Sequence, residues 1–219
     1  MAKLYFRHGV VGSAKTLNLL AVAHSYRQQN KEVLLLKPKL DDRFGVKSIA
    51  SRAGLKMEAD FLLEDSTLFS FKGRVFGGSS DLESQQQVIV LDRKKPVSCL
   101  ILDEVQFLSE RICDVLAEIT ILFDIPVICY GLKTDFRGKM FVGSKRLIEL
   151  ADRIEEIKTT CFNCNKKATY NLKLQGQTPV FSGRTIELGV EDKYLPSCKY
   201  CYYNARKEKK LPPDFKRYH

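Results

Sequence analysis

The amino-acid sequence predicts an α/β fold, in which a parallel sheet has helices on both faces and a small cysteine-rich module follows it. Three observations lead to this prediction. Apolar runs typical of buried strands alternate with segments of helical periodicity. A glycine-containing turn joins the first strand to the first helix. The alternation ends after Asp152, and two pairs of cysteines follow a domain boundary predicted near residue 157.

The N-terminal part of the chain predicts a strand, a helix and a second strand. Residues 3–8 are apolar and aromatic, and residues 15–30 carry apolar side chains at helical spacing. The apolar run at 32–36 is continuous, as in a strand buried on both faces. This order predicts a right-handed βαβ unit. Residues 39–55 are polar with scattered glycines and predict loops.

The middle of the chain repeats the alternation. We predict a short strand at 88–91, a buried strand at 99–102 and a third strand at 126–130. A helix is predicted over 109–123, with its first residue, a serine, as the N-terminal cap. A further short helix is predicted over 146–152, after which the alternation ends.

The turn after the first strand, Gly9–Thr16, resembles a phosphate-binding loop. The pattern G-x-x-x-x-G-K-[ST] is matched at Gly9, Lys15 and Thr16, whereas Ala14 occupies the place of the second glycine. Backbone N–H groups of such a loop and the following helix N-terminus point at phosphates. Lys15 would reach the β- and γ-phosphates, and the Thr16 hydroxyl would hold Mg²⁺. The alternative is a plain strand–helix turn.

An acidic pair, Asp103 and Glu104, follows the buried strand at 99–102. Strand ends in parallel sheets border the ligand crevice, so both carboxylates would face the phosphates. Asp103 can hold Mg²⁺, and Glu104 can take a proton from an attacking hydroxyl. The alternative is a surface pair that caps the next helix.

The two cysteine pairs have the C-x₂-C spacing of a zinc site. Four thiolates close a tetrahedral site, so the metal would be structural and would contribute to folding. The alternatives are redox-active pairs or unligated thiols. The predicted ligands are Cys161, Cys164, Cys198 and Cys201. Three further cysteines lie in apolar stretches and predict buried thiols: Cys99, Cys113 and Cys129.

The formal net charge is +10, which favours anionic partners. Part of the charge lies in a basic segment at 204–219, which predicts a solvated tail or subunit contact. A nucleic-acid-binding zinc protein is an alternative, but the cysteine pairs carry no recognition-helix pattern, so nucleic acid is an unlikely partner. No apolar run is long enough for a membrane span, and the N-terminus lacks a signal peptide, so we expect no membrane partner and a cytoplasmic location.

These features together resemble the tetrameric, zinc-containing thymidine kinases, from about residue 3 to residue 203. The resemblance rests on the order and spacing of separate blocks. These are 6–16, 41–45, 51–54, 103–107 (Asp-Glu-Val-Gln-Phe), 130–137 with Phe141, and 150–152, followed by the cysteine pairs.

The resemblance implies an ATP-dependent transfer of phosphate to the 5′-hydroxyl of deoxythymidine, giving deoxythymidine monophosphate. Glu104 matches the general base, and Arg52 matches the arginine that reaches the 5′-hydroxyl and the transferred phosphate. It also implies a homotetramer, with Mg²⁺ and structural Zn²⁺. The nucleotide-binding residues would be Gly9, Val10, Val11, Gly12, Ser13, Ala14, Lys15, Thr16, Asp103 and Gln106.

The thymine pocket is implied in two parts. Its aromatic and apolar wall would comprise Phe107, Leu132, Phe136 and Phe141, for which ordinary core packing is the alternative. A loop that closes on the substrate would read the pyrimidine edge through its backbone at Ile186, Glu187, Leu188, Gly189 and Tyr194.

The implied organisation is a P-loop kinase domain at 1–157, a zinc-ribbon-like lasso domain at 158–203 and the basic tail at 204–219. The chain departs from the family pattern at Val11, Ala14, Lys133 and Met140. Ala14 adds a methyl group beside the phosphate path. The alternative function is therefore a catalytically weakened or inactive relative that binds a nucleoside or nucleotide.

Overall fold

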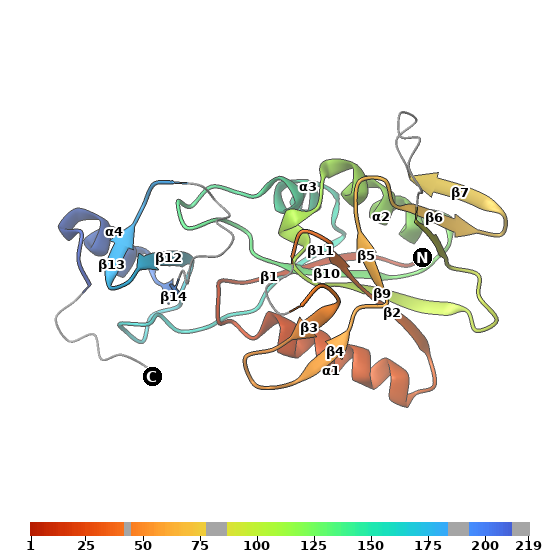
Figure 1. The fold of residues 1–219 in the computed structure, drawn as a ribbon, viewed down its shortest axis with the longest axis horizontal. Helices are drawn as coiled ribbons and strands as arrows, with labels where there is room; N and C mark the ends of the chain where they lie inside the picture. Colours follow the sequence, from red (N-terminus) through yellow and green to blue (C-terminus); the bar gives the residue numbers. More distant parts are fainter. Residues whose placement is uncertain (42–44, 78–86, 184–192, 212–219) are drawn as a thin grey trace.

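The computed structural model describes residues 1–41, 45–77, 87–183 and 193–211 (Figure 1). Its main sheet has six strands in the order β11-β1-β10-β9-β2-β5, and neighbouring strands all run parallel. The strands are β1 Leu4–His8, β2 Glu32–Pro38, β5 Phe61–Leu63, β9 Val97–Leu102, β10 Val127–Gly131 and β11 Arg153–Glu156. The predicted parallel α/β sheet is confirmed.

Helices cover both faces of this sheet, as Figure 1 shows. On one face, Leu34 and Leu36 of β2 share a core with α2 (Glu110–Leu122) and α3 (Val142–Leu150). On the other, Val33 and Leu35 pack with α1 (Lys15–Gln28). Successive strand residues point to opposite faces, and each face here is covered. The uninterrupted apolar run of β2 follows from that double burial.

The helix boundaries agree with the sequence at α1 and α2 but not at α3. Ser109 caps α2, since its hydroxyl accepts a hydrogen bond from the Ile112 N–H at 3.4 Å. Helix α3 begins at Val142, earlier than predicted, and includes Gly143. A Cβ on Gly143 would lie 2.5 Å from the carbonyl oxygen of Val105. The glycine therefore serves close packing of the helix on its neighbour rather than a turn.

The predicted end of the alternation is wrong. The alternation does not end at Asp152, because β11 continues the main sheet beside β1. Every residue of β11 is exposed, and its charged sequence gives no apolar period. The segment 39–55 is loop-rich in its described residues, as predicted, and includes one short strand, β3 (Ser48–Ala50), which pairs with β4 (Lys56–Glu58).

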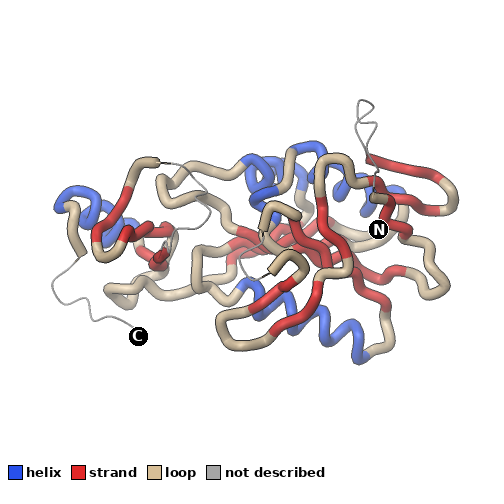
Figure 2. The backbone as a smooth tube through the Cα atoms, viewed as in Figure 1, coloured by secondary structure: helices blue, strands red, loops and turns tan. Residues whose placement is uncertain are grey.

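A further small sheet, β7-β6-β8, lies beside α2 and comprises β6 Leu68–Phe71, β7 Arg74–Gly77 and β8 Val88–Val90. The short strand predicted at 88–91 is confirmed by β8. In Figure 2 these three strands lie at one end of the molecule, and the strands of the C-terminal part of the chain lie at the other end.

The C-terminal module (residues 158–211) has its own three-stranded sheet, in which β12 (Tyr170–Gln175) lies between β13 (Thr178–Val180) and β14 (Lys193–Ser197). Helix α4 (Lys199–Glu208) packs on it. The helix continues past residue 204, where a tail was expected to begin, and Ala205 is buried. The rest of that expected tail, 212–219, lies outside the described residues. Among the described residues, no helix has both the length and the apolar character needed to cross a membrane.

Candidate functional site

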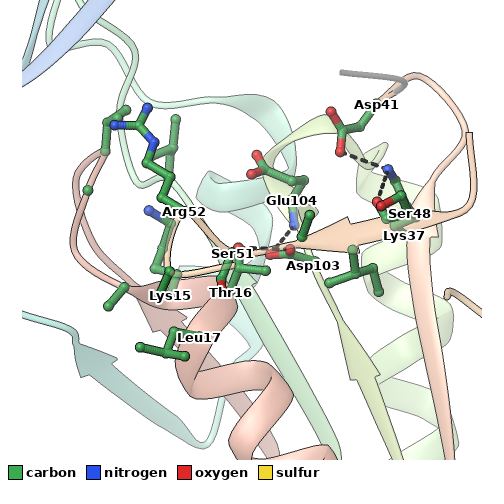
Figure 3. A pocket seen from close by; sticks show the side chains of 17 residues that line it. Lys15, Thr16, Leu17, Lys37, Asp41, Ser48, Ser51, Arg52, Asp103 and Glu104 are labelled. Atoms are coloured by element: carbon green, nitrogen blue, oxygen red, sulfur yellow. Dashed lines mark hydrogen bonds and ion pairs between the residues drawn. The ribbon is translucent and has the colours of Figure 1, made fainter. Parts of the chain in front are cut away.

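A cavity of about 390 Å³ lies at the carboxyl ends of the parallel strands (Figure 3). Its walls come from segments that are distant in sequence: the phosphate loop, the end of β2, the β3 region, and the residues after β9 and β10. The lining residues are Val11, Gly12, Ala14, Lys15, Thr16, Leu17, Lys37, Asp41, Ser48, Ile49, Ala50, Ser51, Arg52, Ala53, Asp103, Glu104 and Leu132. Parallel α/β sheets bind ligands at this edge.

The phosphate loop connects β1 to α1 and has the backbone conformation that its pattern demands. Gly12 and Ala14 both lie in the left-handed region, with φ of +76° and +62°. Ala14 therefore follows the path that a glycine would take, at a cost of roughly 1 kcal/mol for its Cβ. Lys15 is only 8% exposed, and its ammonium donates a hydrogen bond to the Val10 carbonyl at 2.8 Å.

The inner side of the phosphate loop is closely packed, and its outer side lines the cavity. The Ser13 hydroxyl is buried and has no hydrogen-bond partner among the residues that the structure describes. This hydroxyl is not part of the cavity wall, because it lies on the inner side of the loop beside Gly9. Gly9 leaves no room for a side chain, since a Cβ there would lie 2.3 Å from the Ser13 Oγ. The loop is thus closed on its inner side and open toward the cavity.

The acidic pair lies across from the loop. The Thr16 hydroxyl donates to the Asp103 carboxylate at 3.0 Å, and the Glu104 N–H donates to the other carboxylate oxygen at 3.0 Å. Burial, and then the neighbouring Glu104, raises the pKa of Asp103 to about 7. A hydroxyl and a carboxylate in contact form an oxygen donor set that suits Mg²⁺.

Glu104 is held from behind by Gln106. The Gln106 amide N–H donates to the Glu104 carboxylate, while its carbonyl oxygen accepts from the Leu132 N–H at 2.9 Å. Gln106 is 2% exposed, so it is a support for Glu104 rather than part of the cavity wall. Gly131 is required beside it, because a Cβ there would lie 2.6 Å from the Gln106 Oε1.

Arg52 lines the same cavity although it is far from the loop in sequence. It follows Ser51 in a tight turn between β3 and β4, where the Ser51 N–H donates to the Leu55 carbonyl at 2.8 Å. Figure 3 shows Arg52 and Lys15 on the side of the cavity formed by the phosphate loop, and Asp103 and Glu104 on the other side.

The sequence analysis missed a buried ion pair at the end of β2. The Lys37 ammonium lies 3.0 Å from the Asp41 carboxylate and donates to the Ser48 carbonyl at 3.0 Å. Both charged side chains are buried and line the cavity. The available signal is a lysine that directly follows the apolar run at 32–36.

The predicted thymine-binding residues are not gathered at this cavity. Leu132 lines it, whereas Phe107, Phe136 and Phe141 do not belong to its described wall. Phe107 and Phe141 pack edge to face with ring centres 5.9 Å apart. Phe136 is 1% exposed, and the Lys173 ammonium lies 5.1 Å from its ring centre.

The predicted substrate loop lies largely outside the described residues, which exclude Ile186, Glu187, Leu188 and Gly189. Tyr194 is half-buried on β14, opposite Lys173 of β12. The assignment of these residues to a thymine pocket therefore stays a prediction.

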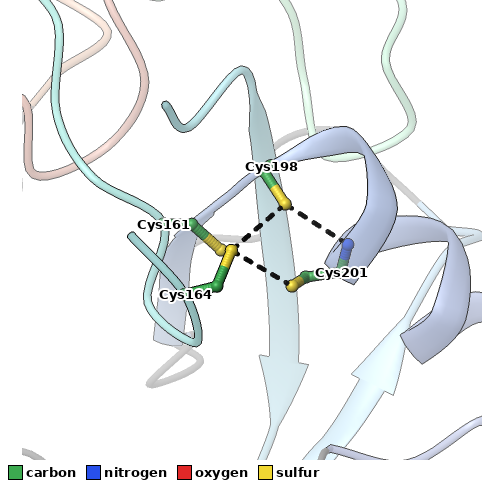
Figure 4. Close-up of side chains that lie close together, drawn as sticks. All are labelled: Cys161, Cys164, Cys198 and Cys201. Carbon is green, nitrogen blue, oxygen red and sulfur yellow. Dashed lines mark hydrogen bonds between the residues drawn. The ribbon is translucent and has the colours of Figure 1, made fainter. Parts of the chain in front are cut away.

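The four predicted zinc ligands come together in the C-terminal module (Figure 4). Their sulfur atoms all lie within 4.8 Å of one another, and Cys164 Sγ is 3.7 Å from Cys198 Sγ and 3.8 Å from Cys201 Sγ. Tetrahedral ligands at zinc–sulfur distance are about 3.8 Å apart. Burial raises the pKa of Cys161, but backbone N–H groups outweigh it and lower the pKa to about 7. The cluster fits a zinc ion.

The sequence of this chain is similar to those of known thymidine kinases. The family model described as thymidine kinase matches residues 2–202. A thymidine kinase of Listeria monocytogenes serovar 1/2a is 42% identical over 205 residues, covering 93% of this chain and 98% of its own. One from Lactiplantibacillus plantarum is 39% identical over 203 residues, covering 93% and 96%. One from Lactobacillus johnsonii is 37% identical over 209 residues, covering 95% and 100%.

Proposed function

This chain belongs to the thymidine kinase family, and from that premise we propose that it transfers the γ-phosphate of ATP to the 5′-hydroxyl of deoxythymidine, giving deoxythymidine monophosphate and ADP. The observation that carries the proposal is the single cavity in which the phosphate loop, the acidic pair and Arg52 meet. That set of groups supplies a phosphate site, a base and positive charge within one enclosed space.

Glu104 is the base in this proposal. Its carboxylate accepts the 5′-hydroxyl proton as the oxygen attacks the γ-phosphorus, and the bond from phosphorus to the ADP oxygen breaks. Two contacts support the role. The backbone N–H of Glu104 is fixed by Asp103, and its carboxylate is held by Gln106. A base held from two sides keeps its orientation toward the substrate.

The chain neutralises the phosphate charge through fixed groups. Lys15 and the N-terminus of α1 lie at the loop, and Arg52 reaches the cavity from the β3–β4 turn. Fixed positive groups in a cavity stabilise charge without reorganising during the reaction. Thr16 and Asp103 would hold Mg²⁺, which neutralises charge on the β- and γ-phosphates.

Replacing Glu104 with glutamine tests the proposal. The amide keeps the size and a hydrogen bond but cannot accept the proton, so kcat should fall by roughly 100-fold or more. The measurement is phosphate transfer from ATP to deoxythymidine with Mg²⁺ present. Glu110→Gln, the same change at an exposed position on α2, should leave kcat unaltered. Turnover of Glu104→Gln within twofold of the native rate would remove Glu104 as the base.

Ala14 supports a second candidate function, a relative that binds nucleotide but turns it over weakly or not at all. Its Cβ lies on the cavity wall beside the phosphate loop. Ala14→Gly removes that methyl group without changing the left-handed backbone. Calorimetric titration with ATP separates the two functions: a rise in affinity of roughly tenfold or more on restoring glycine supports the weakened relative, and an unchanged affinity supports the kinase.

Structural Zn²⁺ and a homotetramer complete the proposal. The sulfur spacing supports the metal. Exposed apolar side chains on the β7-β6-β8 sheet and at the end of α2, such as Val75 and Ile121, support an association of chains. Light scattering should give four times the chain mass of 25.0 kDa, and a monomer at micromolar concentration would contradict the tetramer.

A further inference from the structure

Asn171 joins the C-terminal module to the phosphate loop. Its side-chain carbonyl accepts a hydrogen bond from the Val11 N–H at 2.8 Å, and its side-chain N–H donates to the Thr134 carbonyl at 2.9 Å. The residue is 2% exposed. One buried amide thus contacts both the loop after β1 and the segment after β10, and it comes from neither.

The Val11 N–H belongs to the same peptide group as the Val10 carbonyl. That carbonyl accepts from the Lys15 ammonium at 2.8 Å and from the Ser13 N–H at 3.2 Å. The group is planar, so its N–H and C=O point in opposite directions and turn together. By fixing the N–H, Asn171 also fixes the direction of the carbonyl on which the Lys15 ammonium rests.

Asn171 lies on a strand that is itself well held. It is on β12, the central strand of its sheet, and faces Pro196 of β14 in the register. The next residue, Leu172, is completely buried in the module core. The Tyr202 hydroxyl also donates to the Phe136 carbonyl at 2.7 Å, which ties the module to the same segment that holds Thr134. The amide is therefore fixed in space.

We propose that Asn171 is a positioning residue for the phosphate loop, which sets the Val10–Val11 peptide and with it the Lys15 ammonium for binding a nucleotide triphosphate. The proposal rests on the proposed function for the identity of the ligand. It requires the C-terminal module to contribute to phosphate binding, in addition to providing the predicted substrate loop.

Hydrogen exchange of the ligand-free protein tests the clamp without any nucleotide. Asn171→Leu keeps the side-chain volume and removes both hydrogen bonds. Exchange of the Val11 amide should become roughly tenfold faster, which corresponds to about 1.4 kcal/mol. Asn204→Leu is the matched control, since Asn204 is exposed on α4 in the same module. Unchanged protection of residues 9–16 in a folded Asn171→Leu variant would overturn the proposal.

Nucleotide binding provides a second readout that simple loss of packing would not give. The Kd for ATP with Mg²⁺ should rise roughly tenfold in Asn171→Leu, about 1.4 kcal/mol, while the Kd for deoxythymidine stays within twofold. Asn171→Thr replaces the amide with one hydroxyl, which can serve the Val11 N–H or the Thr134 carbonyl, and should give an intermediate value. If Asn171→Leu does not fold, Asn171→Thr decides the matter through the same two measurements.

The two proposals fail in different ways. If the native protein does not bind ATP, the proposed function is lost, while hydrogen exchange still tests the clamp. If native and Asn171→Leu proteins bind ATP equally well, the kinase assignment stands and the positioning role of Asn171 is overturned.

Discussion

The six-stranded parallel sheet and the three-stranded sheet of the C-terminal module differ in how much apolar surface each can bury. The parallel sheet is covered on both faces, by α1 on one and by α2 and α3 on the other. Among the described residues, the buried core of the module comprises Leu172, Leu174, Leu195, Tyr202 and Ala205, with four partly buried apolar side chains packed on it and the four cysteines beside it. A core of that size rarely holds a fold without a staple. The comparison indicates that the large sheet folds by packing, whereas the module needs a staple, for which the four cysteines are the candidate ligands.

The difference between the large domain and the C-terminal module matters for function as well as for stability. The phosphate loop, the acidic pair and Arg52 all extend from the large domain and line one cavity. Among the described residues, the module contributes to that loop the buried side-chain amide of Asn171. A small ligated module can therefore influence a site built almost wholly on its larger neighbour.

Removing one of the four candidate zinc ligands should have the largest effect, and this effect should be confined to the C-terminal module. Cys198→Ser removes one of four thiolates, and metal binding contributes on the order of 10 kcal/mol to folding in small zinc modules. The variant should lose its zinc, and protease should cut within 158–211 while the parallel sheet keeps its circular dichroism. Zinc content by atomic emission and limited proteolysis measure both results. Cys113→Ala, a buried cysteine of the large core, should retain zinc. A Cys198→Ser protein with full zinc content and native proteolysis would contradict the role of ligation.

Truncating the large core should have the next largest effect. Leu100 on β9 is completely buried, so Leu100→Ala should lower the free energy of unfolding by about 2–5 kcal/mol through lost burial and the cavity left behind. Chemical denaturation measures the change, and zinc content should not alter. Val90→Ala, where the side chain is 43% exposed, should cost less than about 0.5 kcal/mol. Equal effects of the two changes would show that the parallel sheet does not depend on its packing.

Removing a hydrogen bond between the two regions should lower the free energy of unfolding by less. Tyr202→Phe removes the hydroxyl that donates to the Phe136 carbonyl and leaves that carbonyl without this partner. The expected loss is about 1–2 kcal/mol, with faster hydrogen exchange in residues 132–137. Tyr200→Phe, at a tyrosine that is 66% exposed, is the control and should be neutral. Identical exchange in the two variants would show that this bond does not couple the regions.

The smallest effect should come from the phosphate loop, and it has the opposite sign. Ala14→Gly relieves a left-handed Cβ but gains freedom in the unfolded chain, so a net stabilisation of about 0.5 kcal/mol is expected. The midpoint of thermal unfolding should rise by about 1–2 °C. Ala117→Gly within helix α2 should instead destabilise, by about 1 kcal/mol. A loss of stability in both variants would mean that Ala14 is not strained.

The sequence by itself determined the features that depend on local spacing. The apolar run of β2, the Ser109 cap, the loop at Gly9–Thr16 and the two cysteine pairs could all be identified because each has a short-range pattern with one physical cause. The acidic pair after β9 was identifiable for the same reason, since strand ends in a parallel sheet share an edge.

The tertiary structure alone decided which distant residues meet. Strand β11 has no apolar period because it is exposed at the sheet edge, and Lys37 gains its importance from Asp41 and Ser48 after the chain turns back. Asn171 is an unremarkable polar residue in sequence, and its contact with Val11 spans 160 positions. Such contacts depend on how whole elements pack, and no local pattern records that packing.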